Sequence, residues 1–322
     1  MEFQVVPFRG KYLDDAAELV TERYKLLREL VFELPARYEH AESVSSLLQE
    51  LANRSPGVVA IEGSRLVGFL MARVISLFRG KRTAYCPEWA HAADPDNSCE
   101  IYQEMYAAVS EDWISDKCCA HSITLFADDR AAIDAWFWEG FGLLAVDAIR
   151  DLSRAEGGAT DTDITRAEPA DVDALLRLGE ALRHHLSSAP TFLADVNNPD
   201  RRRSWENEIR NEEICIQLAR QAGKPIAYMK VGPANPRACH IIQDDKTASV
   251  TGAFTDPDFR GRGVGTALLN SCVDWARSAG YERCAVDFES MNLVGSRFWL
   301  RHFRPICLSA MRIVDERIHQ LH

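Results

Sequence analysis

Apolar residues recur along the chain with two periods, one typical of helices and one typical of strands. Spacings of three and four residues predict helices over residues 13–30, 98–114, 129–138 and 172–182. Short apolar runs bounded by polar turns predict two hairpins, over residues 58–71 and 214–231, and strands over residues 122–126, 143–149 and 249–255. Strands that alternate with helices in this way are typical of the α/β (α+β) class.

The order of these elements begins again after about half of the 322 residues. The matching segments are residues 67–70 and 226–229, Trp113 and Trp275, and Phe137-Trp138 and Phe298-Trp299, and their sequence offsets are 159, 162 and 161, respectively. Such similar offsets predict an internal duplication of one fold. The alternative is that many chains alternate strands and helices without any duplication.

A polar segment separates the two predicted copies. Residues 154–162 have no apolar periodicity and include the pair Gly157-Gly158, which is typical of a linker. We therefore expect one domain over residues 1–153 and a second over residues 163–322.

The charge balance narrows the classes of partner. Lys and Arg number 37 against 48 Asp and Glu, a net charge of −11, so nucleic acid and anionic membranes are not expected as partners. No uncharged apolar run is long enough to span a membrane, and the first residues do not resemble a signal peptide. Nine cysteines without a CxxC pair favour reduced thiols and a cytoplasmic protein.

A glycine-rich segment of the second copy stands between a predicted strand and a predicted helix. Asp256-Pro257 forms a turn after the strand, and Arg260-Gly261-Arg262-Gly263-Val264-Gly265 leads into the helix. Glycines before a helix let backbone N–H groups point at a ligand, and the helix N-terminus adds roughly half a positive charge. The segment therefore predicts a phosphate-binding loop, with Arg260 and Arg262 as further contacts.

The glycine spacing excludes two common phosphate loops. Gly261, Gly263 and Gly265 are spaced GxGxG instead of the GxGxxG of dinucleotide-binding folds, and no Lys-Ser/Thr pair follows, as a nucleoside-triphosphate loop requires. Arg260, Gly263 and Gly265 fit the pattern Arg/Gln-x-x-Gly-x-Gly. With Asn292 opening the helix after the next strand, residues 163–316 resemble the acetyl-coenzyme A-binding domain of the Gcn5-related N-acetyltransferase (GNAT) family.

The resemblance implies two tandem GNAT folds, each a mixed central sheet flanked by helices. It also implies acetyl-CoA as co-substrate and no metal. The pyrophosphate would lie on the amides of residues 262–266, and the pantetheine arm beside residues 253–255 and Asn292. The residues that this resemblance assigns to acetyl-CoA are Phe254, Thr255, Arg260, Gly261, Arg262, Gly263, Val264, Gly265, Thr266, Asn292 and Phe298.

The implied chemistry is direct attack of an amine on the thioester, which needs a base for the protonated amine and an acid for the leaving thiolate. Many family members use a Tyr as the acid, but the matching position holds Trp299, whose indole is not a usable acid. Candidates for the base are Asp244 and Asp245, in the loop entering the motif strand, and Glu289, after the following strand. The alternative reading of all three is a solvated surface carboxylate.

Two adjacent histidines fall in the part that forms the acceptor pocket in related enzymes. Neighbours on one helix cannot both face a pocket, so we expect one of His184 and His185 to line it. The alternative is a capped helix end, and the pair lacks the i+4 spacing of metal ligands.

The first copy has no glycine from residue 81 to residue 97, so no phosphate loop is expected there and the domain would be degenerate. The resulting hypothesis is an acetyl-CoA-dependent N-acetyltransferase that acts on a small-molecule or peptide amine through its second domain. The negative charge favours a cationic small amine. Alternatives are a non-catalytic CoA-binding regulatory or scaffold protein, and transfer of longer acyl chains. The residues do not indicate an oligomeric state.

Overall fold

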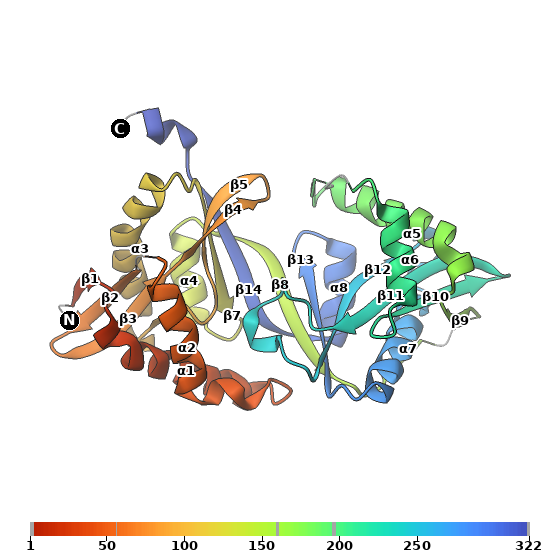
Figure 1. Cartoon of the computed structure of the whole chain (residues 1–322), viewed down its shortest axis with the longest axis horizontal. Coiled ribbons are helices and arrows are strands. Elements are labelled where there is room, and N and C mark those ends of the chain that lie inside the picture. Colours follow the sequence, from red (N-terminus) through yellow and green to blue (C-terminus); the bar gives the residue numbers. More distant parts are fainter. Residues whose placement is uncertain (1–2, 56, 159–160, 195–197, 321–322) are drawn as a thin grey trace. The chain divides into compact units, whose positions relative to one another are not determined.

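The computed structural model describes residues 3–55, 57–158, 161–194 and 198–320. The chain divides into two compact units (Figure 1). Unit 1 extends to Asp147 and also takes in Cys239–Ile241 and the segment from Pro305 on, whereas unit 2 comprises Ala148–Ala238 and Ile242–Arg304. These units differ from the two predicted halves of the sequence, because the C-terminal segment belongs to unit 1.

The helices and strands of unit 1 are β1 (Gln4–Pro7), α1 (Leu13–Leu30), α2 (Ala41–Ala52), β2 (Gly57–Glu62), β3 (Arg65–Met71), β4 (Arg73–Phe78), β5 (Lys81–Cys86), β6 (His91–Ala93), α3 (Ser98–Ser115), β7 (Ala120–Phe126), α4 (Arg130–Trp138), most of β8 (Gly142–Asp151) and nearly all of β14 (Arg304–Ile313). One sheet has the order β1-β2-β3-β6, and a second places β4, β5, β7 and β14 side by side. All strand pairs of the first sheet are antiparallel. In the second, β5 and β7 are parallel, whereas β4 with β5 and β7 with β14 are antiparallel, so this sheet is mixed.

The C-terminal strand β14 pairs with β7 of unit 1. The antiparallel ladder runs from Cys307 opposite Phe126 to Ile313 opposite Ala120. The Ser122 hydroxyl also donates to the Ala310 carbonyl at 3.0 Å. Because an unpaired strand edge leaves its N–H and C=O groups without partners, this ladder gives a physical reason for the inclusion of β14 in unit 1.

The helices and strands of unit 2 are β9 (Asp163–Arg166), α5 (Val172–Ser187), α6 (Arg201–Arg210), β10 (Cys215–Gln221), β11 (Lys224–Pro233), β12 (Thr247–Thr255), α7 (Val264–Ser278), β13 (Arg283–Glu289) and α8 (Leu293–His302). The strand order is β13-β12-β11-β10-β9, with β12 and β13 parallel. Helices α5 and α6 cover one face of this sheet and α7 the other (Figure 1). A core on the α5 side joins Leu175 and Leu178 to Ile216, Leu218 and Tyr228.

The hairpins of the two units correspond at the predicted offset, which makes Ala60 equivalent to Ala219. β2 pairs with β3 and carries a register shift between Ala60 and Ile61, and β10 pairs with β11 and carries one between Ala219 and Arg220. A bulge at the same place in both hairpins supports the duplication.

The helices that carry the matched tryptophans align at a different offset from the hairpins. Asp129 and Asn292 each cap a helix by accepting the N–H three residues later, which makes these two positions equivalent. In this alignment the buried Trp299 corresponds to Trp136, which is 1% exposed, whereas Trp138 is 76% exposed. The predicted pairing of Phe137-Trp138 with Phe298-Trp299 is therefore wrong, because helix capping and burial align Trp136 instead.

The alignment set by the two caps also relates the ends of α3 and α7. It makes Lys117 equivalent to Gly280, and both have positive φ, 61° and 86°, just after their helices. Trp113 therefore corresponds to Ala276 and not to Trp275. The predicted Trp113–Trp275 pair was one residue out of register.

The two units differ where the phosphate loop was predicted. Both carry Asp-Pro-Asp before the helix, at residues 94–96 and 256–258. In unit 2 a loop follows and α7 begins at Val264, whereas in unit 1 α3 begins at Ser98 and is three residues longer than α7. In the alignment set by the caps, helical Ser98–Glu100 stands in the place of the glycine loop.

Part of the predicted linker is fixed to α7. The Ala155 N–H donates to Asn270 Oδ1 at 2.7 Å, and Asn270 Nδ2 donates back to the Ala155 carbonyl at 3.1 Å. Arg154 also pairs with Asp274. Residues 159–160 of the predicted linker lie outside the described residues.

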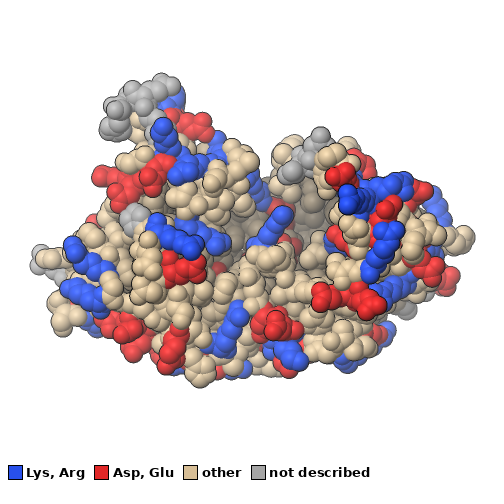
Figure 2. All heavy atoms as spheres, viewed as in Figure 1, with Lys and Arg blue, Asp and Glu red and all other residues tan. Residues whose placement is uncertain are grey.

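Acidic and basic side chains are interspersed on the face that Figure 2 shows. All nine cysteines are free thiols. Among the described residues, no helix is long and apolar enough to cross a membrane. Within the same residues, no group of three or more His, Cys, Asp or Glu is arranged to hold a metal ion.

Candidate functional site

The predicted phosphate loop ends at an uncapped helix N-terminus. Gly261 and Gly263 have φ of 74° and 80°, a left-handed conformation that favours glycine. Gly263 occupies the N-cap of α7, and no side chain of the described residues caps the helix there. The first N–H groups of an α-helix have no partner within the helix, so those of α7 are available to a ligand.

The strand that precedes the loop separates from its neighbour. The parallel ladder between β12 and β13 runs only from Thr247 and Arg283 to Val250 and Val286. A register shift against β11 makes Thr251 an extra residue in β12, and such bulges bend a strand. The last residues of β12, 253–255, keep their pairing with β11 but are not paired with β13, so one edge is open to an extended ligand.

Helix α8 closes the opposite side of the site. Asn292 caps it by accepting the Gly295 N–H on Oδ1 at 3.2 Å. A Cβ at Gly295 would lie 2.6 Å from Asn292 Nδ2, so a larger residue here would shift the Asn292 side chain. Phe298, one turn further along α8, packs against Gly265, where a Cβ would lie 3.1 Å from its ring.

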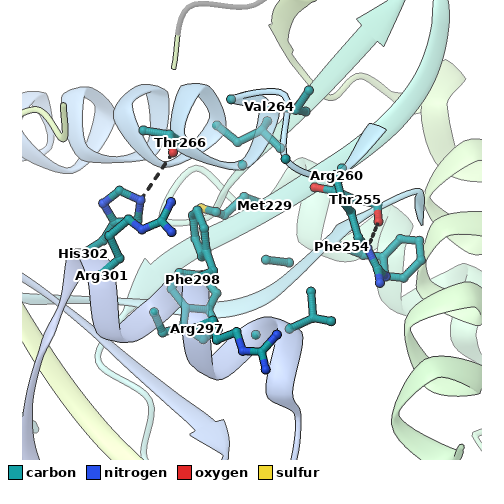
Figure 3. A pocket seen from close by; sticks show the side chains of 18 of the residues that line it. Met229, Phe254, Thr255, Arg260, Val264, Thr266, Arg297, Phe298, Arg301 and His302 are labelled. Carbon is teal, nitrogen blue, oxygen red and sulfur yellow. Dashed lines mark hydrogen bonds between the residues drawn. The ribbon is translucent and has the colours of Figure 1, made fainter. Parts of the chain in front are cut away.

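A cavity of about 460 Å³ lies among the loop, the end of β12 and α8 (Figure 3). The predicted residues that line it are Phe254, Thr255, Arg260, Gly261, Gly263, Val264, Gly265, Thr266, Asn292 and Phe298. Arg262 is the exception, because its exposed side chain lies over the Phe259 ring, outside the lining. Only the backbone of Arg262 remains in the predicted role.

Arg260 is held in place by the strand. Its Nε donates to the Thr255 carbonyl at 3.0 Å, and its guanidinium lies 5.4 Å from the centre of the Phe254 ring (Figure 3). These contacts fix the loop to the end of β12.

Three basic or titratable cavity residues on α8 were not predicted. Arg297 and Arg301 are one turn apart, and His302 follows, with its Nε2 3.3 Å from Thr266 Oγ1 (Figure 3). Burial, with a smaller effect from the nearby arginines, lowers the pKa of His302. In the sequence, the four-residue spacing of Arg297 and Arg301 indicates a basic face on the helix that follows Asn292.

The predicted base candidates do not line the cavity. Asp244 precedes β12, where it accepts hydrogen bonds from Arg283 Nη1 at 2.9 Å and from Thr247 Oγ1 at 2.9 Å. With a strand rise of about 3.3 Å per residue, Thr247 and Thr255 are roughly 26 Å apart along β12. Asp244 and the exposed Asp245 therefore lie at the far end of the strand from the cavity. Glu289 ends β13 but is not among the lining residues either.

The structure distinguishes the two predicted histidines. His185, in the last turn of α5, lines the cavity and its Nε2 lies 3.0 Å from Asn292 Oδ1. His184 is exposed, and its carbonyl accepts the hydroxyls of Ser187 and Ser188 at the helix end. One histidine reaches the cavity, as helix geometry requires.

Two further aromatic residues, Trp299 and Tyr228, line the cavity. Trp299, 7% exposed, lines it from α8. Tyr228 of β11 also lines it, and burial raises the pKa of its phenol well above the ordinary value. Neither group is suited to donating a proton near neutral pH. The site can therefore hold phosphates at the α7 N-terminus and an extended chain along β12.

Comparisons with known proteins agree with this geometry. Residues 180–303 match the family model described as Acetyltransferase (GNAT) family. A stretch of 77 residues is 36% identical to an uncharacterized N-acetyltransferase of Methanocaldococcus jannaschii, and covers 22% of this chain and 30% of that protein. The chain thus matches less than a third of that relative's length.

Two solved structures share the fold over most of this chain. A GCN5-related N-acetyltransferase from Sphaerobacter thermophilus is 12% identical, with a TM-score of 0.56, covering 97% of this chain and 95% of that one. The GCN5-related glucosamine N-acetyltransferase region of a fungal multi-domain GH3 beta-N-acetylglucosaminidase is 14% identical, with a TM-score of 0.52, covering 96% of this chain and 38% of that one. The predicted GNAT fold is confirmed: residues 180–303 match the family model, and the whole chain shares its fold with the Sphaerobacter thermophilus structure.

Proposed function

We propose that this chain is an acetyl-CoA-dependent N-acetyltransferase that acts on a primary amine by direct attack, with its active site in unit 2. The observation that carries the proposal is the uncapped N-terminus of α7, preceded by left-handed Gly261 and Gly263, which faces the cavity. The cavity's size is within the range of small-molecule sites.

The lining residues fit the parts of acetyl-CoA. The N–H groups of residues 264–266 and the guanidinium groups of Arg297 and Arg301 suit the phosphates. The open edge of β12 at residues 253–255 suits the extended pantetheine arm. Acetyl-CoA supplies the activated acetyl group, and an amide of that edge can stabilise the negative charge that develops on the acetyl oxygen.

Direct measurements test the proposal. Calorimetry of the full chain with acetyl-CoA should show binding, and a thiol-release assay with a panel of primary amines, including small molecules and peptides, should show turnover. Absence of binding at millimolar acetyl-CoA would contradict it. Comparison of acetyl, propionyl and succinyl donors tests the acyl preference.

We expect one acetyl-CoA to bind per chain. Helical Ser98–Glu100 stands in unit 1 where the glycine loop stands in unit 2, so the backbone N–H groups cannot form the same site. Glu100 also adds a negative charge to that helix start. The stoichiometry from calorimetry checks this: a value near two would contradict a degenerate first domain.

The carboxylate of Asp244 is expected to affect stability and not the reaction. Asp244→Asn removes a charged partner from Arg283, whose side chain is 13% exposed, and should lower the free energy of unfolding by about 1–2 kcal/mol. kcat/KM should stay within about threefold of the unchanged protein. Asp245→Asn, at an exposed neighbour, is the control and should change neither quantity. A large fall in kcat/KM for Asp244→Asn at unchanged stability would restore it as a base candidate.

A second candidate function is CoA binding without turnover. Trp299 favours it, because a buried indole stands where many family members place an acidic Tyr. The amine panel separates the two: thiol release that depends on any amine excludes a binding-only protein.

The structure also changes the argument about the acceptor. Asp244 and Asp245 lie away from the cavity and give no support to a cationic acceptor, and Glu156 is the one carboxylate among the described lining residues. We therefore propose a primary amine without specifying its charge.

A further inference from the structure

We infer that His185, with its ring held by Asn292, is the catalytic base that deprotonates the acceptor amine. This rests on the proposed function, because it assigns a residue to that reaction. The observation behind it is the contact between His185 Nε2 and Asn292 Oδ1 at 3.0 Å inside the cavity.

The helix cap determines which ring nitrogen of His185 carries the proton. Asn292 Oδ1 accepts the Gly295 N–H, and a backbone N–H requires an acceptor, so this atom is the amide oxygen and not the nitrogen. His185 must then donate to it from Nε2. In the neutral ring, Nδ1 is left with its lone pair as the acceptor of a proton. No other hydrogen bond to the His185 ring occurs within the described residues.

The other charged and titratable groups around the cavity are less suited to the role. Arg260, Arg297 and Arg301 are cations. Tyr228 has its pKa raised by burial. The remaining groups are Glu156 and His302, which lie near the N-terminus of α7, the phosphate end of the cavity under the proposed function. Arg183 and His184 neighbour His185 on α5.

Two contacts place Glu156 and His302 at the phosphate end. Gly158, two residues after Glu156, packs against the first turn of α7, where a Cβ would lie 3.0 Å from the Ala267 nitrogen. His302 contacts Thr266 in the same turn of α7. His185 instead contacts the N-terminal cap of α8. It is therefore at the end where the thioester lies if the phosphates occupy the α7 N-terminus.

The proposed step moves two protons off the acceptor nitrogen. His185 Nδ1 takes one proton from the ammonium form of the acceptor, which frees the nitrogen lone pair. The nitrogen forms a bond to the thioester carbonyl carbon, and the carbon–sulfur bond breaks with its electron pair on sulfur. A second proton leaves the nitrogen as the amide forms and neutralises the thiolate, and the proton on His185 passes to solvent.

A comparison of His185→Gln with His184→Gln tests the role. His185→Gln should lower kcat/KM about 100-fold for the most active amine of the panel, while the Kd for acetyl-CoA by calorimetry stays within about threefold. The exposed His184 is the matched control, and its variant should keep full activity. His185→Ala should recover activity when imidazole is added, because free imidazole can replace a missing base.

The pH profile provides a readout that a structural role would not change. In the wild type, kcat/KM should fall at acidic pH, forming an acidic limb, because protonation of Nδ1 removes the base, and in His185→Gln the fall should instead follow the ionisation of the acceptor amine, at higher pH. Asn292→Asp should move the limb to higher pH, because a carboxylate beside Nε2 stabilises the imidazolium. Asp is an equally good cap, as Asp129 shows at the corresponding position of unit 1.

The outcomes distinguish this inference from the proposed function. If the wild type turns over no amine, both fail. If the wild type is active but His185→Gln keeps its kcat/KM and its acidic limb, the inference about His185 alone is overturned. Activity lost in His185→Ala without rescue by imidazole, together with weaker acetyl-CoA binding, would assign His185 a structural role and overturn it as well.

Discussion

Gly263→Asp should weaken acetyl-CoA binding by about 100-fold or more. An Asp side chain at this N-cap accepts the N–H groups of the first turn of α7, the same groups proposed to hold the phosphates. Its negative charge also repels the phosphates, at a cost of about 4 kcal/mol for unit charges 4 Å apart near a protein surface. Calorimetry with acetyl-CoA measures the loss, and kcat/KM should fall in parallel.

This variant should still fold. Asp tolerates the left-handed conformation that φ of 80° imposes better than most residues, and it is a favourable N-cap. Gly63→Asp is the matched control, because Gly63 also has a positive φ, of 62°, and no described residue beyond its chain neighbours lies within 4 Å of the position of its Cβ. Equal acetyl-CoA affinity in Gly263→Asp and Gly63→Asp would contradict phosphate binding at α7.

Trp136→Ala should destabilise unit 1 by about 3–5 kcal/mol, the usual range for loss of a buried Trp. Trp136 is 1% exposed, and its ring lies 5.5, 5.4 and 4.8 Å from the ring centres of Tyr102, Tyr106 and Phe141. Its removal leaves a cavity that these rings cannot fill. Urea denaturation followed by far-UV circular dichroism measures the change, since tryptophan fluorescence itself is altered by the substitution.

Trp138→Ala is the control for this prediction, and it also tests the corrected alignment. Trp138 is 76% exposed, so its removal should change the free energy of unfolding by no more than about 0.5 kcal/mol. If the two variants were equally destabilised, the assignment of Trp136 as the counterpart of Trp299 would lose its basis in packing.

The elements that sequence patterns predicted best are those determined by local chemistry. The hairpins at β2-β3 and β10-β11 follow from apolar runs with polar turns, and their predicted correspondence is confirmed by bulges at equivalent positions. The conformation of the glycine loop was also predictable, because left-handed φ at Gly261 and Gly263 is a property of glycine itself.

The aromatic matches show where sequence patterns are insufficient. Phe137-Trp138 and Phe298-Trp299 are identical dipeptides, but the burial of each residue depends on its position relative to the helix cap. Because Asp129 and Asn292 set those positions, Trp136 and not Trp138 faces the core.

Which residues are placed for proton transfer depended even more on tertiary structure. Asp244 precedes the strand that reaches the cavity, but the nine residues of β12 put roughly 26 Å of strand between its two ends. His185 and Asn292 are far apart in sequence and meet only because α5 and the start of α8 line the same cavity.

By itself, the sequence determined the alternation of strands and helices, the repeated order of elements and the glycine loop before α7, because each depends on neighbouring residues. Only the tertiary structure decided that β14 belongs to unit 1, that Arg297, Arg301 and His185 share a cavity with the loop, and that Asp244 does not. The physical reason is that apolar periodicity specifies which face of an element is buried. The partner that buries it, and the side chains that meet there, depend on how distant segments pack together.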